Sequence, residues 1–320
     1  MSDWSALLDV LTPVELHDGR WFKREDLFAP MGAGCPDGTK VRNLIWLFGR
    51  YAAAGGTGVL AGGSVHSPAI ARVAVVAKHY GLRCTVVLGA TKPDTAMKHP
   101  NIAIAAMAGA EFHFVKVAYN PAIQKAIGEI ATAHPDWLRV AYGISLPDDA
   151  PDVDVAEFHA LGAQQVANVP AQVETMIVPA GSCNATASVL MGIAATPPKS
   201  LRHVDLIGMG PSRLDWLRER VAAIERGSGA NIMDKFGEAG TEYTLRFHDL
   251  HGEKFATYAD RRPYTLSGIR FHPTYEGKAQ HYMIAHPDRF RSYLDGDSRS
   301  LFWIVGGESS VAASAVALCG

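Results

Sequence analysis

A lysine opens an apolar helix in the segment Asp37-Gly38-Thr39-Lys40-Val41-Arg42-Asn43-Leu44. Taken alone, Lys40 would be an ordinary surface lysine. The turn glycine two residues before it, however, can aim the amine into a cleft, and a buried amine loses its positive charge more easily than an exposed one. A neutral amine is what a lysine needs to form a Schiff base with a carbonyl compound. The segment therefore predicts a reactive lysine at position 40.

Strand-like and helix-like segments alternate along the chain after this helix. Short apolar runs predict buried strands, and amphipathic or alanine-rich stretches predict helices. The expected strands are 58–61, 83–88, 111–117, 138–141, 174–179, 203–208 and 301–305, and the expected helices include 95–108, 121–133 and 211–226. This βαβα order implies an α/β fold, in which parallel or mostly parallel sheets carry helices on their faces.

A second motif, Gly62-Gly63-Ser64-Val65-His66-Ser67-Pro68, joins an expected strand to an expected helix. The start of a helix leaves backbone N–H groups free. Ser64 or Ser67 can cap these groups, or the groups can bind an anion such as the α-carboxylate of a substrate. His66 is either a base or a packed histidine, and the sequence leaves both interpretations open.

A third motif, Pro179-Ala180-Gly181-Ser182-Cys183-Asn184-Ala185-Thr186, also lies between a strand and a helix. An ordinary tight turn can have this composition. Its small residues, however, let backbone N–H groups close around a phosphate, and the Ser and Thr hydroxyls can add hydrogen bonds. The motif is therefore a candidate phosphate loop.

Two further motifs lie toward the C-terminus: Thr274-Tyr275-Glu276-Gly277-Lys278-Ala279 and Trp303-Ile304-Val305-Gly306-Gly307. The first is either a surface turn with a Glu–Lys pair or a site in which Glu276 serves a cofactor. A carboxylate close to a pyridine nitrogen favours the protonated form of that nitrogen and strengthens the ring as an electron sink. The second motif is a strand that ends in paired glycines and is weak by itself.

Taken in order, these motifs resemble the fold-type-II pyridoxal-phosphate (PLP) enzymes of the tryptophan-synthase-β-like family. The likeness is to D-cysteine desulfhydrases and 1-aminocyclopropane-1-carboxylate (ACC) deaminases, whose pattern KRED-L followed by G-N-K-x-R-K-L matches residues 23–27 and the segment around Lys40. The ACC deaminases also carry Y-E-G-K, as residues 275–278 do, whereas the desulfhydrases commonly have Thr in place of this Glu. The resemblance covers almost the whole chain. It implies pyridoxal 5′-phosphate as cofactor and two α/β/α sheet domains.

The resemblance also implies roles for single residues. Lys40 would bear the cofactor covalently, and Glu276 would face its pyridine nitrogen, with Tyr275 against the cofactor as a catalytic group. Ser67 would contact the substrate or take part in acid–base chemistry. The cofactor phosphate would be held by Gly181, Ser182, Cys183, Asn184 and Thr186, and the substrate by Ser64, His66 and Ser67. No metal site is expected, because the histidines lack ligand spacing.

Several positions depart from the family pattern. Thr39 stands where the family usually has Asn, and Asn43 where it usually has a basic residue, but neither change removes the amine of Lys40. Pro68 replaces an asparagine that supports the ring hydroxyl of the cofactor. Residues 183–185 replace glycines of the phosphate loop. The change at position 68 leaves the reaction open more than it affects cofactor binding.

Three functions follow as hypotheses. The first is a PLP-dependent lyase or deaminase that acts at the α and β carbons of a small amino acid. The second is an enzyme of phage-type thymidine hypermodification, acting on an amino-acid group attached to a DNA base, because residues 90–99 loosely resemble a bacteriophage branch of the family. A basic rim of Lys92, Lys98 and Arg72 would then meet DNA. The third is a PLP-fold binding protein without catalytic activity.

The composition sets outer limits on these hypotheses. The 320 residues carry a net charge of −2, which supplies no global positive field for nucleic acid. Four scattered cysteines without a CxxC pair suit a reducing compartment, and residues 1–10 lack the basic start of a signal peptide. We expect a cytoplasmic homodimer, in the host cytoplasm if a phage encodes it. Residues 1–51 and 157–320 would form a large PLP-binding domain, and residues 52–156 a small mobile one.

Overall fold

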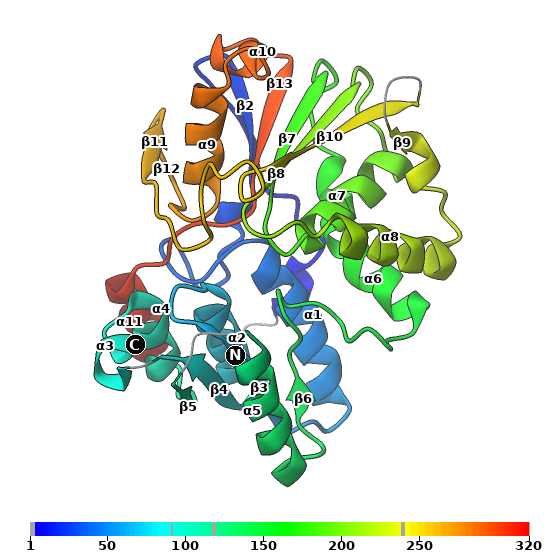
Figure 1. The fold of residues 1–320 in the computed structure, drawn as a ribbon. Coiled ribbons are helices and arrows are strands. Elements are labelled where there is room, and N and C mark those ends of the chain that lie inside the picture. Colours follow the sequence, from blue (N-terminus) through cyan, green and yellow to red (C-terminus); the bar gives the residue numbers. More distant parts are fainter. Residues whose placement is uncertain (1–3, 91, 117–119, 238–240, 320) are drawn as a thin grey trace. The chain divides into compact units, whose positions relative to one another are not determined.

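The computed structural model describes residues 4–90, 92–116, 120–237 and 241–319 (Figure 1). The chain divides into two compact units. Unit 1 comprises Met1–Leu8, Ala29–Asp148 and Glu308–Gly320, and unit 2 comprises Asp9–Phe28 and Asp149–Gly307.

These units divide the chain differently from the expected domains. Helix α1 (Thr39–Ala53), which was expected in the large domain, belongs to unit 1 because it packs against helix α2 (Ala69–His79) of that unit. The boundary at Asp148 falls within the polar stretch that separates the two halves of the sequence. Lys40 and the motif at 62–68 therefore belong to the same unit.

Unit 1 is built on a parallel four-stranded sheet in the order β5-β4-β3-β6. Its strands β3 and β4 are almost continuous apolar runs, as is typical of parallel strands whose two faces are both covered. The strands are β3 (Gly58–Ser64), β4 (Arg83–Gly89), β5 (Glu111–Val115) and β6 (Leu138–Arg139).

Helices cover both faces of this sheet. A Cβ atom at Gly62 would meet Ile123 of α5, whereas one at Gly63 would meet Ile70 of α2. Neighbouring residues of a strand point to opposite faces, so α2 and α5 lie on opposite faces of the sheet. Helices α1 and α4 pack against α2, and α11 packs against α4. The remaining helices of unit 1 are α3 (Pro93–Met97), α4 (Pro100–Met107), α5 (Asn120–Ala133) and α11 (Val311–Cys319).

Unit 2 contains a seven-stranded sheet in the order β1-β2-β13-β7-β8-β10-β9. All neighbours in this sheet are parallel except β1 and β2, which form an antiparallel hairpin at one edge. The strands are β1 (Val14–His17), β2 (Arg20–Arg24), β7 (Thr175–Ala180), β8 (His203–Gly208), β9 (Phe236–Gly237), β10 (Tyr243–Asp249) and β13 (Ser300–Ile304).

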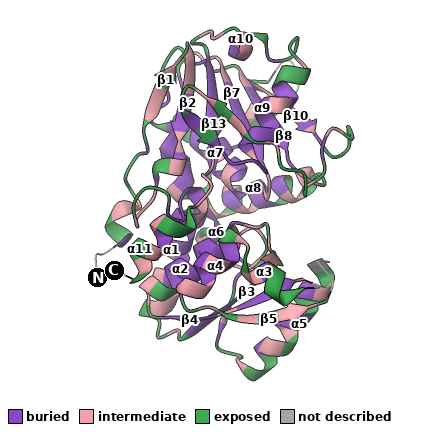
Figure 2. Ribbon diagram, turned by 90° about the vertical axis from the view of Figure 1, so that its left-hand side faces the viewer, coloured by how far each residue is buried: buried purple, intermediate pink, exposed green. Residues whose placement is uncertain are grey.

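The core of unit 2 lies between this sheet and helix α9. Ile177 and Phe302 on the strands are buried together with Tyr282 and Met283 on α9. Figure 2 shows β7, β8 and α9 as largely buried elements. A separate group of helices, α6, α7 and α8, packs mutually. These helices are α6 (Asp152–Ala163), α7 (Asn184–Ala195), α8 (Leu214–Ser228) and α9 (Glu276–Ala285). Unit 2 also contains α10 (Arg291–Leu294) and the hairpin β11 (Tyr264–Leu266) with β12 (Ile269–Phe271).

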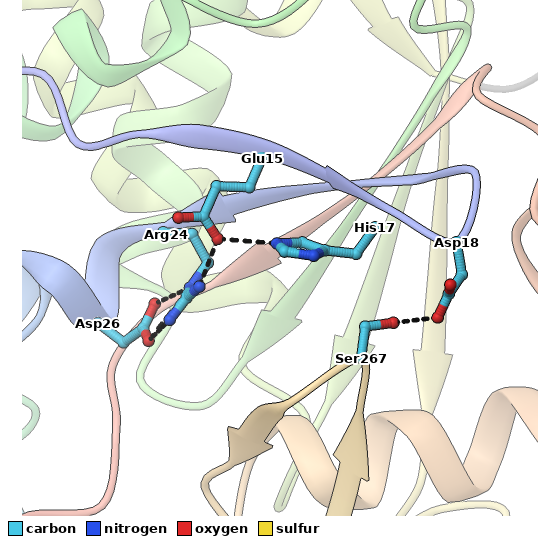
Figure 3. A network of polar contacts seen from close by, with 6 residues as sticks. All are labelled: Glu15, His17, Asp18, Arg24, Asp26 and Ser267. Atoms are coloured by element: carbon cyan, nitrogen blue, oxygen red, sulfur yellow. Dashed lines mark hydrogen bonds and ion pairs between the residues drawn. The ribbon is translucent and has the colours of Figure 1, made fainter.

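The charged motif at residues 23–27 has a structural role in unit 2. Arg24 forms ion pairs with Glu15 of β1 and with Asp26, and His17 contacts the same glutamate (Figure 3). The ammonium group of Lys23 is fully buried and donates to Asn168 Oδ1 at 2.8 Å. The Arg24–Glu15 pair joins the two strands of the edge hairpin, and the Lys23–Asn168 hydrogen bond joins the hairpin to the segment after α6.

The predicted α/β fold with mostly parallel sheets is confirmed. Strand 203–208 has the predicted bounds, whereas the helix expected over 95–108 is two helices, α3 and α4. The break falls at His99-Pro100, because a residue that precedes proline is driven out of the helical conformation; His99 is extended, with a ψ angle of 134°. Within the described ranges, no helix is long and apolar enough to cross a membrane.

Candidate active site

Lys40 is the second residue of α1, and a glycine fixes the turn before it. Gly38 has a φ angle of +86°, a conformation that favours glycine, and its carbonyl accepts the N–H of Val41 at 2.9 Å. The helix therefore starts directly after Gly38, and Lys40 in its first turn is half-buried. Burial, and secondly the positive charge of Arg72, lower the pKa of Lys40 to about 8. Near neutral pH this amine is uncharged roughly three-hundredfold more often than an ordinary lysine.

A buried ion pair holds the Lys40 turn onto helix α2. Arg72 donates from Nε to the backbone carbonyl of Asp37 at 2.6 Å and from Nη2 to Asp37 Oδ1 at 2.9 Å. Both side chains are buried. Helix α2 follows the motif at 62–68, so this pair joins that motif to the Lys40 turn. The expectation that Arg72 belongs to an exposed basic rim is wrong, because Asp37 already holds its buried guanidinium group.

The motif at 62–68 forms a turn between β3 and α2. Ser67 donates its backbone N–H to the carbonyl of Ser64 at 3.0 Å, and both serines are half-buried. Pro68 is the cap residue of α2, and it provides no backbone N–H and no side-chain cap. The turn therefore presents two serine hydroxyls but fewer donors than a helix start with asparagine at this position.

His66 is exposed and pairs with His99, which the sequence interpretation did not include in the site. His66 Nδ1 lies 3.2 Å from His99 Nε2, and the two rings meet edge to face. His99 Nδ1 accepts the backbone N–H of Asn101 at 3.4 Å, so in neutral His99 the proton is on Nε2 and is donated to His66. His66 is thus neither buried in a core nor hydrogen-bonded to a serine of the turn.

The candidate phosphate loop connects β7 to α7 in unit 2. Cys183 takes a left-handed conformation with a φ angle of +66°, which lets α7 start at Asn184. Cys183, Asn184 and Thr186 are buried, whereas Gly181 and Ser182 are half-buried. Within the part of the chain that the structure describes, the buried Oγ1 of Thr186 has no hydrogen-bond partner.

The motif at 274–279 lies against this loop. A Cβ atom at Gly181 would lie 2.9 Å from Cε1 of Tyr275, so the ring packs directly on the loop backbone. The hydroxyls of Tyr275 and Tyr258 are 2.7 Å apart. Lys278 is buried and donates to the carbonyls of Thr257 and Tyr258 at 2.6 and 2.9 Å. The alternative of a surface turn with a Glu–Lys pair is therefore wrong.

Glu276 joins the fourth motif to the fifth. Its side chain is fully buried, and its Oε1 accepts the backbone N–H of Val305 at 2.9 Å. Val305 directly follows β13, so the carboxylate sits at the carboxyl end of a central strand. Unit 2 thus brings together three predicted motifs, at 181–186, 274–279 and 303–307. Unit 1 brings together two, around Lys40 and at 62–68.

Each unit carries groups that suit PLP. In unit 2, the hydroxyl of Thr186, which has no hydrogen-bond partner among the described residues, and the start of α7 offer donors for a phosphate. In unit 1, Lys40 offers an amine with a lowered pKa that can react with a carbonyl carbon. Glu276 offers a buried carboxylate for the pyridine nitrogen. When bound, PLP withdraws electrons from the α carbon of an amino acid. Among the described residues, no three histidine, cysteine or carboxylate side chains gather as ligands for a metal ion.

The sequence interpretation missed several residues around these motifs. Tyr258 lies 17 residues before Tyr275, and Arg72, which the sequence analysis placed in a basic rim, lies 35 residues after Asp37. Nothing in the sequence marks either residue as a partner. Lys278 was visible in the motif, but its burial and its carbonyl partners were not. The pKa of Lys278 is lowered to about 8, first by burial, so it is a second lysine with a lowered pKa.

Comparisons with known proteins identify the family of this chain. Residues 11–262 match the family described as "Pyridoxal-phosphate dependent enzyme". The chain is 34% identical, over 95% of its length and 83% of the relative's, to the "O-seryl-dTMP PLP-dependent decarboxylase" of Salmonella phage ViI. It is 28% identical, over 89% of its length and 85% of the relative's, to the "Nocardicin C-9' epimerase" of Nocardia uniformis subsp. tsuyamanensis.

A solved structure supports the fold. The crystal structure of an ACC deaminase homologue superposes with a TM-score of 0.67 at 20% identity, over 97% of this chain and 94% of that one. The fold-type-II architecture, the family match and the phage relative together confirm the resemblance and the cofactor. The protein therefore belongs to the family of pyridoxal-phosphate dependent enzymes.

Proposed function

We propose that the protein is a decarboxylase of an amino-acid group, such as a seryl group, that is attached to a thymine nucleotide. In this reaction the bond between Cα and the carboxylate carbon breaks, CO2 leaves, and a proton is added to Cα. The observation that carries the proposal is the 34% identity, across 95% of the chain, to a relative named for O-seryl-dTMP decarboxylation.

The turn at 62–68 supports loss of a carboxylate. A carboxylate held by many hydrogen-bond donors is stabilised as an anion, whereas decarboxylation converts it to neutral CO2. Pro68 removes one backbone donor and places no polar side chain there. Arg72, the buried cation of α2, is engaged by Asp37. The turn therefore offers its hydroxyls for orientation without a strong anion-binding group.

Lys40 suits the proton transfer. With its pKa lowered to about 8, its Nζ atom can hold a proton and release it near neutral pH. We propose that Lys40 Nζ delivers the proton to Cα, that Tyr275 packs against the cofactor, and that Ser67 orients the substrate. Glu276 would hold the proton of the pyridine nitrogen.

The test is a product analysis with three arms. The substrate is an oligonucleotide that carries an O-seryl-thymidine whose carboxyl carbon is isotopically labelled. Decarboxylation releases the label as CO2 and leaves a primary amine on the base. Release of ammonia would instead indicate elimination, and exchange of the α-hydrogen without CO2 would indicate epimerisation. Either of these as the main product contradicts the proposal.

A second candidate is a lyase or deaminase that acts on a free small amino acid. The specific observation in its favour is the motif Tyr275-Glu276-Gly277-Lys278, which the ACC deaminases share and in which Glu276, Gly277 and Lys278 are buried. Steady-state assays with D-cysteine, ACC and D- and L-serine distinguish the two candidates. We expect weak turnover of all four, and turnover at ordinary enzyme rates, about 1–1000 per second, would favour the second candidate.

We also propose a homodimer, because the family usually forms one, and light scattering of the loaded protein tests it.

If DNA itself is the substrate, affinity for the oligonucleotide should fall steeply with salt, since each phosphate contact releases counterions. Lys92 and Lys98 are exposed and can make such contacts, whereas Arg72 cannot.

A further inference from the structure

The loops after β7 and β8 lie side by side at the carboxyl ends of these neighbouring strands. Ala180, the last residue of β7, pairs with Gly208, the last residue of β8. Beyond the strands, Met209 still donates its N–H to the carbonyl of Ala180 at 2.9 Å. The chain segment that follows Met209 therefore starts next to Gly181 of the candidate phosphate loop.

The loop between β8 and α8 carries a cationic side chain, Arg213. Arg213 is the last residue before α8, as Cys183 is the last before α7, and the two helices pack against each other. Figure 1 shows α7 and α8 next to each other in unit 2. Arg213 is half-buried, and its guanidinium carbon lies 4.7 Å from the ring centre of Trp216. Stacking on an aromatic ring holds a guanidinium group in one orientation, and its N–H donors lie in the plane of the group rather than toward the ring.

The positive charge of Arg213 acts on the thiol of Cys183 in the 181–186 loop. Burial raises the pKa of the Cys183 thiol to about 11, and the nearby positive charge of Arg213 acts in the opposite direction. The loop itself has lost the glycines of the family pattern at 183–185, so its backbone is more constrained around a phosphate. Among the residues that the structure describes, the buried hydroxyl of Thr186 nevertheless has no hydrogen-bond partner. A cation near this loop would compensate for the missing glycines.

We propose that Arg213 is a phosphate-binding residue of the cofactor site, which supplements the 181–186 loop with a charged donor. The ligand chemistry is a phosphomonoester dianion, for which the planar guanidinium group is well suited. The phosphate of PLP is the source we infer, because the segment that leads to Arg213 starts beside the 181–186 loop, which we propose holds that phosphate. The phosphate of a nucleotide substrate is the alternative source that the experiment must separate.

The experiment compares PLP with pyridoxal, which has the same ring and carbonyl group but no phosphate. Equilibrium dialysis of the full-length protein gives the affinity for each, and the bound carbonyl is followed by its visible absorbance. For Arg213→Gln we expect PLP binding to weaken about ten- to a hundredfold, the range for losing a hydrogen bond to a charged group, while pyridoxal binding is unchanged. Arg213→Lys, which keeps the charge, should restore part of the PLP affinity.

The matched control is Arg218→Gln, which removes an exposed arginine of α8 that pairs only with Asp215 within the contacts described. It should leave both affinities unchanged. Equal weakening of PLP and pyridoxal by Arg213→Gln would overturn the proposal, because it would indicate a role in the fold alone. An unchanged PLP affinity combined with weaker binding of thymidine monophosphate would also overturn it, by assigning Arg213 to the nucleotide. If Arg213→Gln does not fold, Arg213→Lys must still lower the ratio of PLP to pyridoxal affinity.

Discussion

Arg72 holds Asp37 by two hydrogen bonds, to its carbonyl at 2.6 Å and to its carboxylate at 2.9 Å, and Asp37 lies three residues before Lys40. This contact links the start of the helix that carries Lys40 to the helix that follows the serine turn. It also places a positive charge near the amine. The same pair therefore sets both the position of Lys40 and part of its acidity.

Replacing Arg72 should change the pH dependence of cofactor loading. Arg72→Met removes a positive charge that lowers the pKa of Lys40, and it leaves Asp37 negative nearby, so the pKa rises above about 8. The pH at which PLP loading is half-maximal should then move upward. It can be measured from visible absorbance at a series of pH values.

Arg50→Gln is the control for that measurement, because it removes an exposed arginine from the same helix as Lys40. Breaking a buried ion pair commonly costs about 3–5 kcal/mol, so Arg72→Met should also unfold at lower urea concentration. A loading curve identical to that of the wild type would show that the charge of Arg72 does not reach the amine.

Lys40 should be the lysine that carries the cofactor. Borohydride reduction followed by peptide mass spectrometry should place PLP on the peptide of Lys40, and Lys40→Ala should remove the yellow colour. Lys278 is the matched competitor, since its pKa is also lowered to about 8. Its Nζ atom is held by the carbonyls of Thr257 and Tyr258, so the Lys278 peptide should stay unmodified. Cofactor found on Lys278 would refute the assignment.

Glu276→Gln should keep the cofactor bound but slow the chemistry. The amide preserves the size of the side chain and its contact with the N–H of Val305, while the charge that favours a protonated pyridine nitrogen is lost. We expect exchange of the α-hydrogen of a bound amino acid to slow roughly a hundredfold, measured by NMR in D2O. Glu253→Gln, which changes a partly exposed carboxylate bound to Tyr282, is the control. An unchanged rate would assign the nitrogen to another residue.

Pro68→Asn should shift the balance of products. The asparagine restores a backbone N–H and a side-chain amide at the start of α2, and both can hold a carboxylate as an anion. Release of CO2 should fall about tenfold, while exchange of the α-hydrogen continues. Pro68→Ala separates the two effects, because it restores only the N–H. Faster release of CO2 in Pro68→Asn would contradict our account of the turn.

His159 should make the protein sensitive to acid. Burial, and secondly the charge of Arg220, lower its pKa to about 3 from 6.5 in the unfolded chain. Between these values the unfolded state binds a proton that the folded state does not, so stability falls as the pH decreases from 6.5 towards 3. The full loss is roughly 5 kcal/mol. Urea unfolding of His159→Gln should show a smaller decrease over this range. An equal decrease would assign the acid sensitivity to the carboxylates.

The sequence predicted the parts of the site that depend on neighbours along the chain. The start of α1 at Lys40 and the loop between β7 and α7 follow from local patterns of glycine, apolar runs and small residues. The tertiary partners of Asp37 and Gly181 do not follow from local patterns. Arg72 lies 35 residues from Asp37, and Tyr275 lies 94 residues from Gly181, so only packing brings them together. The pattern at 95–108 was helical throughout, and only the proline at position 100 divides it.

The order of strands in unit 2 has a consequence for how the protein is made. β2 ends at Arg24, yet one of its two neighbours is β13, which begins at Ser300. The sheet of unit 1, by contrast, draws on residues 58–139 only. During synthesis β2 can pair with β13 only after nearly the whole polypeptide has left the ribosome. The four-stranded sheet of unit 1 can form earlier. We expect the smaller sheet to fold first and closure of the larger one to limit the rate, because contacts between distant residues form slowly.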